Sequence, residues 1–300
     1  MNNVDLSKPL ISKRKAKQLT TIVDVSQTPA HIARTIGYTA KSLAIANLPY
    51  HEIDRDRWER KNGNYTFVVV ALKEGTKIPF GVVPRLFFIW LITEIAKTKS
   101  REVIFGDYFN DFLEKIGYTN FGGRERARVR TQLLRLFSCA IGTYYDDEAR
   151  KIAAGSPPES FVQSFNLWTS DKSGDIQQQE LFPAKIVVKQ SFFEEILRTP
   201  IPIDMRIVET FKNSALKLDI YLWLTYRMFS VTKPQHIKYE DLMVQFGGDY
   251  DVNNKKSLNN FKTKFKTALK EVLKVYQANV DTVSSKEIIL LRSETSVQKI

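Results

Sequence analysis

The sequence predicts an α+β fold, mostly helical, that is built from two similar modules. Apolar helices at 84–97 and 218–229 are each followed by a short strand, a helix that ends at glycine, and a long basic helix. Residues with the pattern of a β-hairpin follow each basic helix. Because a whole series of elements recurs, and because 300 residues suffice for two domains of ordinary size, we expect a tandem arrangement.

Residues 1–48 are polar with weak helical character, and they predict an N-terminal arm that is partly flexible. Its basic residues cluster near the start of the chain: Lys13, Arg14, Lys15 and Lys17. We expect the first domain at 49–200 and the second domain at 201–300.

The first module is expected to begin with regular elements of clear type. They are a strand at 65–72 (YTFVVVAL), an apolar helix at 84–97, a short strand at 102–105 (EVIF) and a helix at 106–117. Pro84 suits the first turn of the apolar helix. Asp107 is a candidate N-cap for the next helix, and Gly117 is its candidate C-terminal stop.

The segment GGRERARVRTQLLRL at 122–136 predicts a helix over 123–140, although some of its arginines alternate as in a strand. The apolar residues that fall on one helical stripe favour the helix: Ala127, Leu134, Phe137 and Ile141, with Leu133 at the edge. The opposite face then carries Arg124, Arg128, Thr131, Gln132 and Arg135, with Arg126 and Arg130 near the core edge. The alternative is a helix whose charge faces only water, with Glu125 as its internal partner.

The second module repeats these elements. They are an apolar helix at 218–229, a strand at 236–239, a helix at 240–247 and a basic helix at 253–276. The expected core stripe of the basic helix is Leu258, Phe261, Phe265, Ala268, Leu269, Val272 and Tyr276. The opposite face carries Lys256, Asn259, Asn260, Thr263, Lys266 and Lys270.

A hairpin is expected after each basic helix. In the second module, 279–282 and 287–292 pair around a turn at 283–286. In the first module, 141–147 and 159–168 flank a loop, with 181–188 as a possible third strand. This order is that of a winged helix-turn-helix, in which the last helix enters the DNA major groove. The sequence therefore predicts tandem winged-helix domains, that is, two helix-turn-helix modules with β-hairpin wings.

The net charge of +12 points to a polyanionic partner. Nucleic acid is favoured over an acidic membrane surface, because no strongly basic helix also carries an exposed apolar face. A basic helix fits a major groove about 12 Å wide, amides can bond adenine edges, and lysine reaches phosphates or guanine. The candidate DNA-binding residues are Arg124, Arg126, Arg128, Thr131, Gln132, Arg135, Lys256, Asn259, Asn260, Thr263, Lys266 and Lys270. The arm either enters a minor groove or lends only nonspecific attraction.

The single cysteine, Cys139, excludes a disulfide framework within the chain and suits a reducing compartment. Its apolar context predicts a core position. The N-terminal segment has no apolar signal stretch, and the longest apolar run, 86–92, is too short to span a bilayer. We therefore expect a cytoplasmic protein.

Catalysis finds little support in the sequence. His31, His51 and His236 are isolated and lack metal-ligand spacing, and no Gly-rich loop with Lys-Ser/Thr indicates an ATPase. The acidic segment 144–148 (YYDDE) could bind a hard cation or support strand nicking, although an acidic turn at a strand end is the favoured interpretation. We expect no catalytic residue, no metal and no cofactor.

The segments IPFGVVPRLFFIWLITEIAKTKSREVIFGDYFNDFLEKIG, GGRERARVRTQLLRLF and SALKLDIYLWLTYR resemble the RepA family of plasmid replication initiator proteins. The resemblance is specific over 78–137 and 214–227 and extends over about 65–276. It implies tandem winged-helix domains that bind short direct repeats, called iterons, at a plasmid origin. It also implies help in opening AT-rich DNA for the host helicase. In related initiators, dimers repress their own promoter and monomers start replication.

Three functions remain open at this point. The first is a plasmid replication initiator, the second a transcriptional repressor or autoregulator with the same modules, and the third a DNA-strand nicking enzyme. The expected partners are double-stranded DNA at plasmid origin repeats, host replication proteins such as the helicase or its loader, and a second copy of the chain; no membrane is expected.

Overall fold

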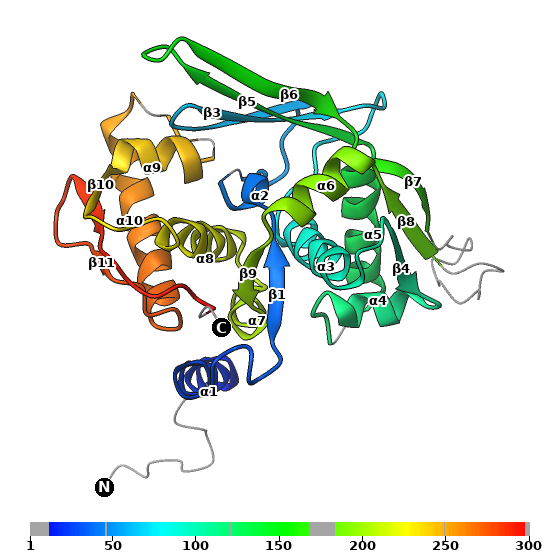
Figure 1. Cartoon of the computed structure of the whole chain (residues 1–300), viewed down its shortest axis with the longest axis horizontal. Helices are drawn as coiled ribbons and strands as arrows, with labels where there is room; N and C mark the ends of the chain where they lie inside the picture. Colours follow the sequence, from blue (N-terminus) through cyan, green and yellow to red (C-terminus); the bar gives the residue numbers. More distant parts are fainter. Residues whose placement is uncertain are drawn as a thin grey trace, which may run out of the picture.

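Two units with the same order of elements make up most of the molecule (Figure 1). The computed structural model describes residues 12–45, 47–119, 122–167, 184–248, 250–251 and 253–297. The first unit comprises α3 (Val82–Thr98), β4 (Glu102–Gly106), α4 (Phe109–Lys115), α5 (Gly123–Phe137), β7 (Val162–Asn166) and β8 (Ala184–Val188). The second comprises α8 (Ala215–Met228), β10 (Gln235–Lys238), α9 (Tyr239–Phe246), α10 (Lys255–Leu273), β11 (Val280–Asp281) and β12 (Glu287–Leu290).

The three strands of each unit form a small antiparallel sheet with the same strand order. The order is β4-β8-β7 in the first unit and β10-β12-β11 in the second. In both sheets, the last strand in the chain lies between the other two strands. The units differ in one respect, because two strands of another sheet, β5 and β6, come between α5 and β7 in the first unit, whereas β11 follows α10 directly in the second. The mixed helical and sheet fold expected from the sequence is confirmed.

Individual residues mark the start of α10 and both ends of α4. Asn254 caps α10, since its side-chain oxygen accepts hydrogen bonds from the backbone N–H groups of Lys256 and Ser257 at 2.9 and 3.2 Å. The N-cap of α4 is Tyr108, so the expected cap at Asp107 is wrong. Gly117 lies just beyond α4 with a φ of 93°, a conformation that favours glycine.

A four-stranded sheet lies across the top of both units in Figure 1. It has the order β2-β3-β5-β6 and is formed by β2 (Arg57–Asn62), β3 (Tyr65–Ala71), β5 (Cys139–Asp147) and β6 (Ile152–Glu159). The expected pairing of 141–147 with 159–168 is therefore wrong, because β5 pairs with β3 and β6. The segment 159–168 instead supplies β7, whose partner is β8 in the expected third strand. Residues 168–183 lie outside the described part of the chain.

The region expected to be an arm contains regular structure from Lys13 onward. It forms α1 (Lys13–Gln27), β1 (Ile36–Thr39) and α2 (Lys41–Ile45). β1 pairs with β9 (Ile201–Asp204), which lies between α6 (Gln190–Arg198) and α7 (Met205–Phe211). α1 packs on α7 and carries the exposed ion pair of Lys17 with Glu209 at 2.9 Å. Strand pairing with β9 thus joins this region to a segment far away in the sequence.

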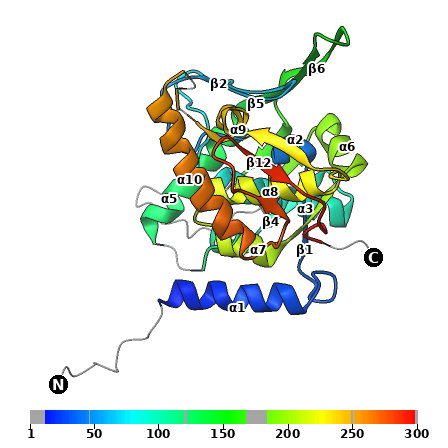
Figure 2. The ribbon, with the colours of Figure 1, turned by 90° about the vertical axis from the view of Figure 1, so that its left-hand side faces the viewer.

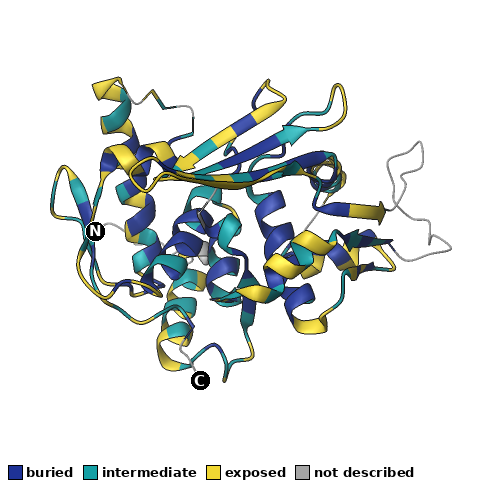
Figure 3. Ribbon diagram, turned by 45° about the horizontal axis from the view of Figure 1, so that its top comes forward, coloured by how far each residue is buried: buried dark blue, intermediate teal, exposed yellow. Residues whose placement is uncertain are grey.

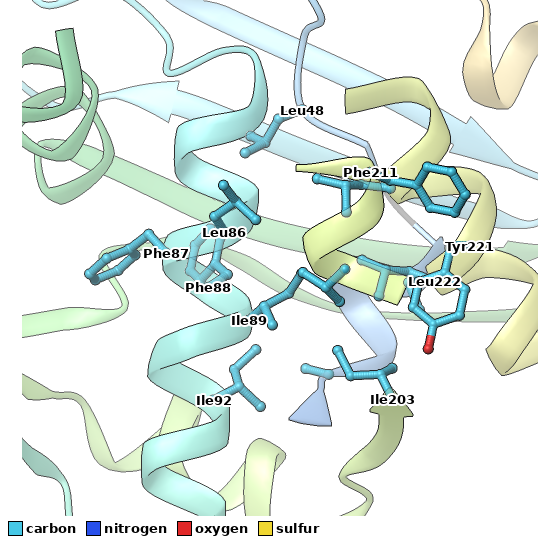
Figure 4. Packing of buried hydrophobic residues seen from close by; sticks show 14 of the residues in the cluster. Leu48, Leu86, Phe87, Phe88, Ile89, Ile92, Ile203, Phe211, Tyr221 and Leu222 are labelled. Atoms are coloured by element: carbon cyan, nitrogen blue, oxygen red, sulfur yellow. The ribbon is translucent and has the colours of Figure 1, made fainter. Parts of the chain in front are cut away.

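The core lies around α3 and α8. Both helices are apolar on nearly every side and buried along most of their length, as expected for helices enclosed by other elements. Figure 4 shows Ile89 and Ile92 of α3 pointing toward Leu222 of α8 and Ile203 of β9. Figure 3 shows buried residues in the central helices and many exposed residues along the outer hairpins. One continuous cluster of buried side chains runs through both units, so the domain limits at 49–200 and 201–300 stay a prediction.

Cys139 is fully buried at the start of β5, as expected from its apolar context, and burial raises the pKa of its thiol to about 12. Among the described residues, no helix is long and apolar enough to cross a membrane.

Candidate nucleic-acid interface

The basic helices α5 and α10 lie on one face of the molecule. Figure 1 separates them along the long axis, and Figure 2 places both on the side away from α6. A hollow of about 340 Å³ between them is lined by Arg128 of α5 and Lys264 of α10, with Tyr50 and Tyr250 among its other walls. The third helices of both units can therefore reach one extended ligand at the same time.

The outward face of α5 differs from the expected face. The buried residues of α5 are Val129, Gln132, Leu133, Leu136 and Phe137. The exposed residues at helical spacing are Arg124, Ala127, Arg128, Thr131 and Leu134. The expected core positions of Ala127 and Leu134 are therefore wrong, and Leu134 is 39% exposed. Ile141 belongs to β5, because the helix ends at Phe137 and not near residue 140.

Gln132 does not lie on the outward face as expected. It is buried, and its Oε1 accepts a hydrogen bond of 2.8 Å from the backbone N–H of Phe80, just before α3. A polar side chain in this position satisfies a backbone donor that would otherwise lose its partner. This hydrogen bond therefore links α5 to the residues just before the apolar helix α3.

Two of the candidate arginines are held by carboxylates of the protein itself. Arg128 pairs with Glu125, and its Nη2 also donates to the hydroxyl of Tyr118 at 3.1 Å. Burial raises the pKa of Tyr118 to about 12, so this hydroxyl stays protonated and accepts the bond through its oxygen. The proposed internal partner Glu125 is thus confirmed for Arg128, which remains exposed at the surface.

Arg135 lies on the flank of α5. Its Nη2 contacts Oε1 of Glu52 at 2.7 Å, and its guanidinium lies 5.5 Å from the centre of the Phe80 ring. The hydrogen bond and the charge of Arg135 hold the pKa of Glu52 below its usual value. Arg126 and Arg130 are half-buried, in agreement with positions near the core edge.

The expected phase of α10 is confirmed. Phe261, Phe265, Ala268, Leu269 and Val272 are buried, Leu258 packs against the core, and Tyr276 is buried just beyond the helix. The exposed residues on the opposite side include Lys256, Asn259, Asn260, Thr263 and Lys270. These side chains are therefore accessible from solvent.

Lys266 is a partial exception on this face. Its Nζ donates to the backbone oxygens of Thr282 and Ser284, both at 3.2 Å, and lies 5.2 Å from the centre of the Tyr239 ring. It is half-buried. Lys266 therefore ties α10 to the turn between β11 and β12.

Sequence reasoning missed several residues of this face. Apolar character predicts a core position for Ala127 and Leu134, although both are exposed. Lys264 is absent from the predicted face, although it is exposed on α10 and lines the hollow. Glu52 gave no sequence signal, since it lies 83 residues from Arg135 along the chain. Thr267 lies four residues after Thr263, which itself lies three residues after Asn260. This helical spacing places Thr267 on the same face and is a signal in the sequence that identifies it.

The acidic segment near the β5–β6 turn has a local structural role. Asp147 is buried, accepts hydrogen bonds from the hydroxyl of Tyr145 at 3.0 Å and from the backbone N–H of Arg150 at 3.1 Å, and so closes the turn.

The side chain of His236 on β10 contacts that of Glu287 on the neighbouring strand β12, with Nδ1 2.9 Å from Oε1. Among the described residues, no group of three or more histidine, cysteine, aspartate and glutamate side chains could hold a metal ion.

Comparisons with known proteins agree with this architecture. The crystal structure of selenomethionine derivatives of domains 2 and 3 of RctB aligns with a TM-score of 0.51 at 12% identity, covering 85% of this chain and 97% of that chain. A second crystal structure of RctB domains 2–3 aligns with a TM-score of 0.50 at 12% identity, covering 84% and 96%. At this identity the likeness concerns the fold alone. No curated protein sequence matches the chain.

The amino-acid sequence, unlike the likeness in fold, identifies a protein family. Residues 78–241 match the family described as plasmid encoded RepA protein. This range begins just before α3, includes all of α5, and ends within α9, so it spans more than half of the chain. It also contains both of the segments in which the sequence resembles RepA proteins most specifically. The chain therefore belongs to the family of plasmid-encoded RepA proteins.

Proposed function

We propose that the chain is a plasmid replication initiator that binds short repeated sequences at its origin through two winged-helix modules and helps open the adjacent DNA. Membership of the RepA family supports a role in plasmid replication initiation. Iteron recognition and DNA opening go beyond that support and belong to the proposal.

In this proposal, α4 with α5 and α9 with α10 are the two helix-turn-helix pairs, and the two small sheets carry the wings. The identical strand orders of β4-β8-β7 and β10-β12-β11 support the assignment. The third helix of a winged-helix module enters the major groove, and α5 and α10 are the third helices. The observation that carries the proposal is that both basic helices lie on one face (Figures 1 and 2).

The charge of the chain supports a nucleic-acid partner over an uncharged one. A net charge of +12 attracts duplex DNA of any sequence, and base contacts then select the site. We assign no catalytic step to the chain and place its action in the cytoplasm. Host helicase or its loader and a second copy of the chain are the proposed protein partners.

The experiment is a footprint on the DNA that flanks the coding region, combined with a plasmid maintenance assay. We expect protected direct repeats beside an AT-rich tract, and loss of both protection and maintenance when Arg124→Ala and Asn260→Ala are combined. Arg198→Ala removes the same type of charge from α6, on the opposite side of the molecule, and should preserve both readouts.

Other outcomes would assign the chain to the alternative functions. Protection of a single inverted repeat at the promoter, with plasmid maintenance independent of the chain, would indicate a repressor. A nicked duplex in the presence of Mg²⁺ would indicate a strand-cleaving enzyme.

A further inference from the structure

The two basic helices present different chemistry on their exposed faces. α5 exposes two arginines, two apolar side chains and one threonine, namely Arg124, Arg128, Ala127, Leu134 and Thr131. α10 contains no arginine between Lys255 and Leu273, and its exposed residues are lysines, asparagines and threonines: Lys255, Lys256, Asn259, Asn260, Thr263, Lys264, Thr267 and Lys270. Since bases are distinguished by the groups at their major-groove edges, the two faces should not select the same bases.

The first half of α10 exposes two adjacent side-chain amides, which can both donate and accept hydrogen bonds. Asn259 and Asn260 are exposed within its first two turns, and the N-terminal part of a recognition helix is the part that contacts base edges. A carboxamide both donates and accepts, so it fits the N7 acceptor and the N6 donor of adenine in a bidentate pair. This half of α10 is therefore suited to adenine.

Two exposed threonines follow on α10, and the hydroxyl of each is bonded within the helix. The hydroxyl of Thr263 donates to the carbonyl of Asn259 at 3.0 Å, and the hydroxyl of Thr267 donates to the carbonyl of Thr263 at 2.8 Å. Because each hydroxyl proton is already used within the helix, the methyl group is the part left for an apolar contact. The C5 methyl of thymine is the apolar group that the major groove offers.

The face of α5 has a different set of groups. Arg124 is exposed in the first turn, where a guanidinium can bind both O6 and N7 of guanine. Arg128 is oriented by Glu125 and Tyr118, as described above, and lies one turn further along the helix. Ala127 and Leu134 add apolar contact surface on the same stripe, which again suits thymine methyl groups.

We propose that the two helices read blocks of different base composition. α10 reads A·T pairs, through asparagine contacts to adenine and threonine methyl contacts to thymine, whereas α5 reads a block that contains guanine together with thymine. Lys256, Lys264 and Lys270 of α10 then bind phosphates and carry no base preference. This assignment rests on the proposed DNA-binding function and adds the chemical identity of the bases at each helix.

The experiment selects the preferred site of the full chain from randomised duplexes and then replaces single bases in it by analogues. We expect one block to contain only A·T pairs and the other to contain guanine. Replacing adenine by 7-deazaadenine should weaken binding about fivefold or more at one or two positions of the A·T block. Replacing thymine by uracil should weaken binding about fourfold at each contacted methyl group. In the other block, 7-deazaguanine should weaken binding about fivefold or more.

A matched variant assigns the A·T block to α10. Thr263→Ser keeps the hydroxyl that bonds to Asn259 and removes only the methyl group. In this variant the uracil substitution should lose its effect at one position of the A·T block and keep its effect in the guanine block. A guanine whose N7 is needed in both blocks, or a uracil effect that Thr263→Ser leaves unchanged everywhere, would overturn the assignment while DNA binding stands. Failure to bind any duplex at low salt would instead overturn the proposed function.

Discussion

Arg85 of α3 and Asp219 of α8 form a buried ion pair that joins the first helices of the two units. Nε of Arg85 lies 2.7 Å from Oδ1 of Asp219, and Nη2 lies 2.8 Å from Oδ2. The side chains are only 5% and 3% exposed. Arg85 also donates to the backbone oxygens of Leu48 and Gly81, both at 2.6 Å. One arginine thus links both units and the segment before the four-stranded sheet.

Removing one partner of this pair is expected to destabilise the whole chain. Burial already raises the pKa of Asp219 against the opposing charge of Arg85, and a partner left alone would keep a charge away from water. Arg85→Ala or Asp219→Ala should lower the free energy of unfolding by about 3–5 kcal/mol, measured by urea denaturation.

Two controls define the origin of this effect. Replacing both partners by apolar residues, Arg85→Met with Asp219→Leu, should restore much of the loss, because no unpaired charge then stays buried. Glu102→Ala breaks the exposed pair with Lys185 and should cost less than about 1 kcal/mol. Equal effects of the buried and the exposed substitutions would contradict a structural role for the Arg85–Asp219 pair.

The sequence predicted the long apolar helices well because their signal is local. α3 and α8 are apolar over most of their length, so nearly any helical phase gives a buried helix. The phase of α10 was also clear, since large aromatic side chains such as Phe261 and Phe265 dominate its stripe. The phase of α5 was not clear, because Ala127 and Leu134 are exposed whereas Gln132 is buried. Counting apolar residues cannot identify a buried glutamine whose partner is the backbone of Phe80.

The hairpin that the sequence predicts for the first unit, 141–147 with 159–168, is wrong for a different reason. Residues of β5 pair with β3, so that Val69 lies opposite Ile141 and Phe67 opposite Thr143. These partners are separated by more than 70 residues, and local alternation does not identify the partner of a strand. The partners in β1 and β9 are more than 160 residues apart, so the local sequence of residues 1–48 predicts a partly flexible arm and gives no sign of this strand pairing.

The contact between Glu52 and Arg135 should limit the part that Arg135 takes in DNA binding. Glu52→Gln removes a negative charge beside α5 and releases the guanidinium, so duplex affinity should rise and depend more steeply on salt. Arg135→Ala should weaken binding less than Arg124→Ala, because Arg135 already has a partner. Fluorescence anisotropy with one duplex over a range of salt concentrations measures both effects.

The pKa of Glu52 gives an independent measurement of the same contact. Since Arg135 lowers this pKa in the folded chain, the contact is formed above the usual glutamate range and is lost as the pH falls through the lowered value. Arg135→Ala should return the pKa of Glu52 toward its usual value in an NMR titration of the carboxyl group. A pKa that does not move would show that the contact is not formed in solution.

Thr131 and Gln132 are neighbours on α5 with opposite expected roles. Gln132→Ala leaves the backbone N–H of Phe80 without its acceptor and should lower the free energy of unfolding by about 1–3 kcal/mol, without changing the preferred DNA sequence. Thr131→Ala should leave stability within about 0.5 kcal/mol and should change binding alone. Thermal unfolding and site selection on both variants test the observed phase of the helix, and the reverse pattern would contradict it.

Lys266 and Lys270 provide a matched test of electrostatic binding on α10. Affinity should fall steeply with salt, with a log–log slope of about −0.9 for each phosphate contact. Lys270 is exposed, so Lys270→Ala should weaken binding to every sequence alike and make the slope shallower by about 0.9. Lys266 instead donates to Thr282 and Ser284, so Lys266→Ala should leave the slope nearly unchanged and speed amide hydrogen exchange in the β11–β12 turn. If Lys266→Ala reduces the slope as much as Lys270→Ala and leaves exchange unaltered, then Lys266 leaves the turn and binds a phosphate in the complex.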